Sequence, residues 1–218
     1  MAPKLLIINP NSTEAMTESI LASARAAAPA AQIDALTSHE GPPAIEGPED
    51  GARAKVPLLR LIAKANQVDA IIIACFDDTG LEEAKALAPV PVIGIGEAAY
   101  AAAQLLGKRF CVVTTLAVSV PIIEANIHST GFAHLCTGVR ASDVPVLALE
   151  HHPAASVEAV AREAERALIE DDPGAIVLGC AGMTGLRARL AHLPVAIIDG
   201  VTSATHLALA ASAIGKAD

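Results

Sequence analysis

The sequence predicts an α/β fold with a parallel sheet and flanking helices, built twice along the chain. Short runs rich in Val, Ile and Leu alternate with Ala-rich stretches of helical length. This alternation is typical of parallel strands joined by crossover helices. A second copy of the pattern follows the first at an offset of about 105 residues. With 218 residues, the chain is long enough for two units of about 100 residues each.

Each predicted strand is a short apolar run, and each predicted helix is the Ala-rich stretch that follows one. The predicted strands are residues 5–9, 32–36, 70–74, 92–95, 110–114, 175–179 and 196–198, with a weak strand around Cys136. The predicted helices are residues 13–28, 52–65, 81–87, 97–106, 118–130, 154–170 and 203–213. The acid-rich helices at 81–87 and 154–170 would have solvated faces, and Asp-Pro-Gly at 172–174 ends the second of these.

Three pairs of matching segments define the internal repeat. KLLIINPNS (4–12) matches RFCVVTTLA (109–117), DAIIIACFDDTGL (69–81) matches GAIVLGCAGMTGL (174–186), and LAPVPV (87–92) matches LAHLPV (190–195). We therefore expect two pseudo-symmetric, Rossmann-like lobes that face each other across a cleft. The N-terminal lobe would comprise residues 1–97 and 201–218, with the last helix crossing back, and the C-terminal lobe residues 98–200.

Composition excludes several classes of function. The net charge is −9 and no basic stripe occurs, whereas nucleic-acid binding needs clustered lysine and arginine. Apolar stretches stop short of the ~20 residues that span a bilayer. The N-terminus runs directly into a strand without signal-peptide organisation, and four cysteines in this length do not form a disulfide framework. We expect a cytoplasmic protein that binds neither nucleic acid nor membrane.

Cysteines at matched strand ends are the main functional signal. Cys75 follows one apolar run, and Cys180 follows the corresponding run 105 positions later. Ligands of open α/β sheets bind outside the carboxyl ends of the strands. A pseudo-two-fold axis would therefore place the two thiols on opposite walls of one cleft. Cys111 and Cys136 lie within predicted strands and are interpreted as structural.

Several roles for a thiol leave one of these cysteines unexplained. No C-x2–4-C pair occurs, so the chain shows neither that zinc spacing nor a C-x-x-C redox motif. A cysteine hydrolase would use one thiol and one of the seven histidines, which leaves the matched cysteine without a role. Two small buried side chains at strand ends are the structural alternative, since free cysteine is often buried.

A pair of bases on opposite faces of one carbon accounts for both thiols. One thiolate removes a proton next to a carbonyl, and the other cysteine, as a neutral thiol, returns a proton to the opposite face. This inverts the stereocentre and needs neither metal nor cofactor. The unperturbed cysteine pKa of about 8.5 makes both forms accessible near neutral pH. Approach distances of about 3–3.5 Å would place the sulfurs roughly 6–7 Å apart.

Polar residues at the strand ends are candidates for substrate contact. They are Asn11, Thr114 and Thr115 after the first strand of each half, and Phe76, Asp77, Asp78 and Thr79 after Cys75. Thr79 and Thr184 are also predicted helix N-caps, which would bring free N–H groups close to each thiol. Alternatively, Asn11 caps a helix, Phe76 packs in the core, and Asp78 caps the following helix. At least one of the two carboxylates should point away or be well bonded, because a carboxylate beside a thiolate raises the thiol pKa.

At these residues the chain resembles the hydantoin racemase group of the aspartate/glutamate racemase superfamily, which includes allantoin racemases. The marks are IINPNS, GPPAIEG at 41–47, ACFDDTGL, VVTT and LGCAGM. The resemblance implies Cys75 and Cys180 as the catalytic pair, no cofactor, and a homo-oligomer. It also implies substrate contacts from Asn11, Phe76, Asp77, Thr114, Thr115, Ala181 and Gly182. The 41–47 loop is interpreted as a lid or as an ordinary surface turn.

Departures from the superfamily pattern indicate the substrate class. The triplets Cys75-Phe76-Asp77 and Cys180-Ala181-Gly182 lack the polar residues typical of the amino-acid racemases, and no cation is near to hold a carboxylate. An uncharged ring, such as a 5-monosubstituted hydantoin including allantoin, fits better. The alternatives are a superfamily member acting on carboxylates (amino-acid racemase, maleate cis–trans isomerase or arylmalonate decarboxylase) and a non-catalytic small-molecule binding protein.

Overall fold

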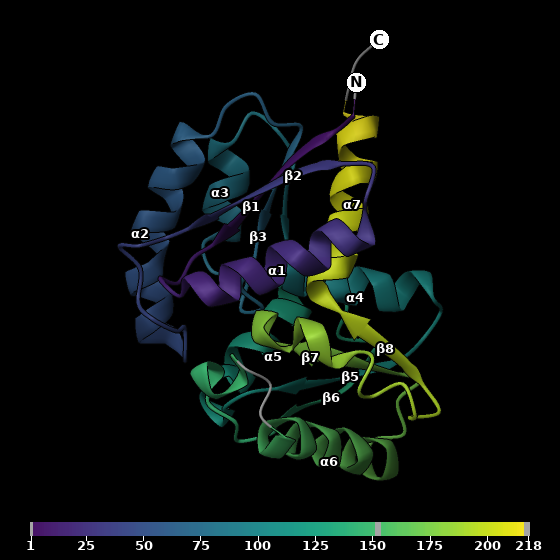
Figure 1. Cartoon of the computed structure of the whole chain (residues 1–218). Coiled ribbons are helices and arrows are strands. Elements are labelled where there is room, and N and C mark those ends of the chain that lie inside the picture. Colours follow the sequence, from purple (N-terminus) through teal and green to yellow (C-terminus); the bar gives the residue numbers. More distant parts are fainter. Residues whose placement is uncertain (1, 151–153, 216–218) are drawn as a thin grey trace.

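The computed structural model describes residues 2–150 and 154–215 and contains two parallel sheets (Figure 1). The first sheet has the order β2-β1-β3-β4 and the second the order β6-β5-β7-β8. The strands are β1 (Lys4–Asn9), β2 (Gln32–Thr37), β3 (Ala70–Ile73), β4 (Val92–Gly94), β5 (Phe110–Thr114), β6 (Cys136–Ala141), β7 (Ala175–Gly179) and β8 (Ala196–Asp199). The identical order confirms the predicted α/β fold with two pseudo-symmetric lobes.

Helices separate the strands, as expected from the Ala-rich stretches. They are α1 (Glu14–Ala27), α2 (Pro48–Lys64), α3 (Leu81–Leu87), α4 (Ile95–Leu105), α5 (Val120–Ser129), α6 (Ala154–Glu170) and α7 (Gly200–Ile214), with short 3-10 helices η1 (Ala117–Ser119), η2 (Val146–Leu149) and η3 (Ala181–Leu186). Helix α2 begins four residues earlier than predicted, with Pro48 in its first turn, where proline needs no hydrogen-bond acceptor.

Two helices cross between the lobes. Helix α4 follows β4 of the first sheet but packs on β7 and β8 of the second, and α7 follows β8 but packs on β3, β4 and α1 (Figure 1). The two helices also pack against each other. The N-terminal lobe was predicted to include residues 201–218. The contacts of α7 suit this prediction for residues 201–215, which the structure describes. The predicted boundary at residue 97 falls inside the first turn of α4 and stays a prediction.

One core cluster extends through both lobes. It is aliphatic, as the 2% aromatic content requires, with a small aromatic group at the junction. Tyr100 of α4 stacks on Phe110 of β5 at 5.6 Å and meets the edge of Phe76 at 5.7 Å. Such pairs stabilise beyond the area they bury. Phe76 belongs to the loop that carries Cys75, so this group fixes that loop relative to the second lobe.

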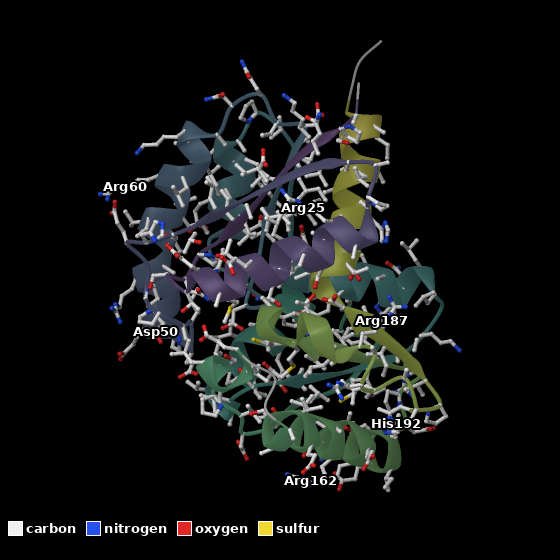
Figure 2. All side chains as sticks on the ribbon, viewed as in Figure 1. Arg25, Asp50, Arg60, Arg162, Arg187 and His192 are labelled. Carbon is white, nitrogen blue, oxygen red and sulfur yellow. The ribbon has the colours of Figure 1, made fainter. Side chains whose placement is uncertain are left out.

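Several charged side chains lie at the periphery, among them Arg162 on α6, a helix predicted to have a solvated face. Figure 2 shows Arg60, Arg162 and His192 on the outer surface, and each of these side chains is more than half exposed. None of the helices in the described part of the chain is both long and apolar enough to cross a membrane.

Candidate active site

A small cavity lies between the two lobes at the carboxyl ends of the strands. Strand pairing places the ends of β1 and β3 side by side in one sheet, and those of β5 and β7 in the other. The cavity has a volume of about 30 Å³. Its lining residues are Asn11, Met16, Ile45, Ala74, Cys75, Phe76, Asp77, Thr114, Thr115, Ser119, Val146, Gly179, Cys180 and Ala181. Most of the residues proposed from the sequence thus meet in one place.

Both predicted cysteines line this cavity, one from each lobe. Cys75 lies two residues after β3, and Cys180 directly follows β7. Both thiols are free. Cys111 and Cys136 do not line the cavity, which suits their interpretation as structural residues. Cys111 is fully buried in β5.

Hydrogen-bond donors surround each of the two cavity thiols. The sulfur of Cys75 lies 3.5 Å from the Thr79 hydroxyl oxygen and also meets the backbone N–H of Asp77. The sulfur of Cys180 meets the backbone N–H groups of Gly182 and Met183 at the start of η3. Bonds of this kind favour the thiolate. The chain therefore provides stabilising donors for a negative charge on either sulfur.

Burial opposes ionisation of both thiols. It raises the pKa of Cys75 far above the ordinary value, and the negative charge of Asp77 raises it further. Burial likewise raises the pKa of Cys180 to about 12, with added contributions from Asp77 and Glu46. Both thiol pKa values therefore lie above the unperturbed cysteine value, because desolvation outweighs the surrounding donors.

Asp77 lies in the cavity and is held by the opposite lobe. The Ser119 hydroxyl donates to its Oδ2 at 3.3 Å, and Asn126 Nδ2 donates to its backbone oxygen at 2.8 Å. Burial raises the pKa of Asp77 to about 6, against the effect of the Ser119 bond, so the carboxylate is mostly ionised at pH 7. It can accept a hydrogen bond from a ligand N–H group.

Asp78 has a different role from its neighbour. Its carboxylate accepts the backbone N–H groups of Gly96 at 2.9 Å and Glu97 at 2.7 Å, in the first turn of α4. It does not line the cavity. The predicted alternative, a cap on the helix that directly follows, is wrong, since Asp78 caps the next helix along the chain. Of the two neighbouring carboxylates, Asp77 and Asp78, it is Asp78 that is well hydrogen-bonded, as was expected for at least one of them.

The predicted threonine caps are corrected by the structure. The N-cap of α3 is Gly80, in the left-handed region at φ 70°, and the Thr79 hydroxyl faces Cys75 instead. Thr184 lies inside η3, where its hydroxyl donates to Asp199 Oδ2 at 2.8 Å. Neither threonine lines the cavity. The matching Thr-Gly-Leu triplets therefore have different roles in the two lobes.

The remaining polar candidates lie where the strand ends predict. Asn11 lines the cavity, with its Oδ1 accepting the Thr13 N–H and its Nδ2 facing the Met16 sulfur at 3.2 Å. Thr115 lines it as well, and the Thr114 hydroxyl donates to the Gly179 carbonyl at 2.8 Å. The amide N–H groups of Asn11 thus face a weak acceptor and remain suited to a ligand.

Of the two candidate residues that follow Cys180, one lines the cavity and the other does not. Ala181 lines the cavity, whereas Gly182 is buried behind Cys180, where a Cβ would lie 3.7 Å from the sulfur. Sequence reasoning missed Met16, Ile45, Ala74, Ser119, Val146 and Gly179 as lining residues. A signal for Ser119 was present in the sequence, because this serine directly precedes a Val-Pro pair that is typical of a helix start.

Comparison with known proteins places the chain in a family. The family model described as Asp/Glu/Hydantoin racemase matches residues 5–208. The chain belongs to this family. It is 45% identical to a hydantoin racemase of Rhizobium meliloti over 215 residues, which is 97% of this chain and 89% of that protein.

Solved structures of allantoin racemases are similar over almost the whole chain. The Klebsiella pneumoniae protein is 42% identical with a TM-score of 0.94, covering 99% of this chain and 90% of that one. The Pseudomonas fluorescens protein is 38% identical with a TM-score of 0.93, covering 97% and 92%. The likeness extends over both sheets and the crossing helices, so it includes every element that forms the cavity.

Proposed function

We propose that this protein is a racemase of 5-monosubstituted hydantoins, allantoin among them, and that Cys75 and Cys180 exchange the C5 proton. The observation that carries the proposal is one cavity between the lobes with a thiol on each wall, each thiol at a matched strand end. The names of the relatives supply the substrate class.

The proton transfer balances without a further reagent. The thiolate of one cysteine takes the C5 proton and becomes a thiol, while the thiol of the other gives its proton to the opposite face and becomes a thiolate. The negative charge passes through an enolate on the adjacent ring carbonyl. Proton exchange of the two sulfurs with water then restores the starting form for another turnover in the same direction, and without that exchange the enzyme is ready for the reverse reaction. High thiol pKa values suit the donor half of this cycle, and the N–H and hydroxyl donors around each sulfur support the thiolate half.

Polar lining residues suit an uncharged ring. The Asp77 carboxylate would accept a ring N–H, and the amide of Asn11 and the hydroxyl of Thr115 would donate to ring carbonyl oxygens. No lysine, arginine or histidine is among the described residues that line the cavity. A substrate carboxylate would therefore meet Asp77 without a compensating cation, which disfavours free amino acids and other carboxylates.

We further propose that the protein is cytoplasmic, forms a homo-oligomer and works without a cofactor. Four free cysteines suit a reducing compartment. Leu105 at the end of α4 and Ile214 at the end of α7 are large apolar side chains more than three-quarters exposed, as an interface between copies would require. Light scattering after size-exclusion chromatography measures the oligomeric state, and a purely monomeric mass would contradict that assignment.

Proton NMR in D2O tests the substrate assignment. Separate enantiopure hydantoins, including allantoin, are incubated with the reduced protein, and the C5 proton signal and optical rotation are followed together. Both should decay much faster than in the protein-free sample. Exchange confined to maleate, arylmalonate or amino-acid substrates would move the assignment to a carboxylate enzyme. Binding of the hydantoin without any C–H exchange would indicate a binding protein.

A further inference from the structure

The cavity is narrow, with a volume of about 30 Å³, so its width depends on a few wall residues. Two apolar side chains from different lobes form part of its wall: Ile45 from the 41–47 loop and Val146 from the start of η2. The room for a ring beside the cysteines therefore depends on how close these two side chains stay.

The first half of the 41–47 loop is fastened to its own lobe. The backbone N–H of Ser12 donates to the Pro42 carbonyl at 2.9 Å, and the Thr13 hydroxyl donates to the Pro43 carbonyl at 2.8 Å. Both donors belong to the segment that enters α1. This half of the loop is therefore a fixed part of the first lobe.

The second half of the loop reaches across the cavity. Glu46 Oε1 accepts the backbone N–H of Val146 at 2.7 Å, a bond between residues 100 positions apart. Within residues 2–150 and 154–215, this is the only hydrogen bond between the loop and the second lobe. The N–H of Glu46 donates to Oδ2 of Asp50, which Figure 2 labels in the first turn of α2, at 3.2 Å.

A glycine follows directly after Glu46. Gly47 has φ 96°, a backbone conformation that side chains disfavour, and a Cβ there would lie 2.7 Å from Val118 Cγ2 in the second lobe. The loop thus passes close to the second lobe at a position where the backbone is free to change conformation. Such a residue suits a hinge.

We propose that Glu46 is a positioning residue that latches the 41–47 loop to the second lobe and sets the width of the cavity. With the bond formed, Ile45 and Val146 stay together as one wall. With it broken, the loop turns at Gly47 and admits the ring. The catalytic meaning of the latch rests on the proposed function, but the latch itself governs access to the cysteines and is measurable without substrate.

Alkylation of the two cavity thiols tests the latch. The protein is treated with iodoacetamide or the larger N-ethylmaleimide, and peptide mass spectrometry follows Cys75 and Cys180 separately. Glu46→Ala removes the acceptor, and Glu46→Asp keeps the charge but is one methylene too short to reach Val146. Both should raise the alkylation rate at both cysteines at least about tenfold, which corresponds to about 1.4 kcal/mol.

Two further variants separate the latch from simpler causes. Glu46→Gln keeps an acceptor oxygen of the same reach, so it should raise the rates much less than Glu46→Asp. Glu49→Ala removes an exposed glutamate three positions away and should leave both rates unchanged. Thermal melts check that each variant is folded. If the alanine variant does not fold, the comparison of Glu46→Asp with Glu46→Gln still tests the latch.

The competing explanation predicts a different pattern. The Glu46 charge raises the pKa of Cys180, so a purely electrostatic role would accelerate Cys180 alone, equally in the Ala and Gln variants and not in the Asp variant. That pattern, or rates in the Asp variant within twofold of Glu49→Ala, overturns the latch. Absence of hydantoin racemisation would overturn the proposed function and leave the latch standing, because the readout is thiol access.

Discussion

Thr79→Val is the substitution that isolates the stabilisation of one thiolate. The two side chains have nearly the same shape, so the change removes the hydroxyl group that lies 3.5 Å from the Cys75 sulfur. A hydrogen bond to a charged group contributes about 1.5–3 kcal/mol. Its loss should raise the Cys75 pKa further, by about one to two units, since one unit corresponds to 1.36 kcal/mol.

The kinetic consequence follows from the two-base scheme. The population of Cys75 thiolate should fall about tenfold to hundredfold, and kcat/KM with it. Because enantiomers have equal free energies, kcat/KM must fall equally in both directions. Polarimetry with each enantiomer of one hydantoin measures both values, and alkylation at Cys75 should slow by a similar factor while Cys180 is unaffected.

The internal repeat provides a matched control. Thr184 occupies the corresponding position, but its hydroxyl donates to Asp199 and not to a cysteine. Thr184→Val should lower the melting temperature, because buried Asp199 loses a donor, and should leave the pKa of Cys180 unchanged. The reasoning is refuted if Thr79→Val keeps kcat/KM within twofold of the unmodified protein, or if both valine variants slow alkylation of their cysteines alike.

Two further predictions concern pH and backbone packing. Since the thiol pKa values are raised, the thiolate fraction and kcat/KM should increase about tenfold per pH unit between pH 7 and 9, after subtraction of the protein-free rate; a flat profile would contradict a thiolate base. Gly200→Ala should lower the melting temperature by about 2–12 °C, because its Cβ would lie 2.6 Å from the Ile95 carbonyl oxygen where α4 and α7 meet. Gly51→Ala, in α2 with its nearest atom at 3.8 Å, should be neutral or stabilising, and equal melting temperatures for the two variants would contradict this packing.

The sequence pattern predicts the scaffold well because its signals are local. Runs of Ile and Val define the strands, and the repeated cysteine motifs place Cys75 and Cys180 at equivalent sheet positions without any three-dimensional information. Strand periodicity and the rule for parallel sheets then bring the strand ends together. For this reason Asn11, Thr114 and Thr115 were predicted at the cavity from the sequence.

The parts that sequence reasoning missed depend on distant contacts. Ile45 and Val146 both line the cavity, and Glu46 bonds to Val146 across 100 positions, but nothing near either segment of the chain indicates the other. The same Thr-Gly-Leu triplet begins an α-helix after Thr79 but lies within a 3-10 helix at Thr184, because tertiary contacts decide between the two. Burial depth, which raises the thiol pKa values, also emerges only when both lobes are assembled.

Isotope exchange by single-cysteine variants tests the two-base claim most directly. Cys75→Ser and Cys180→Ser are each incubated in D2O with the separate enantiomers of one hydantoin, and C5 deuteration and optical rotation are recorded together. The account predicts that racemisation is nearly abolished in both variants, and that any residual deuteration by each variant favours the opposite enantiomer, because one base serves one face of the carbon. Near-full racemisation by either variant would contradict a cysteine on each wall as the proton carriers.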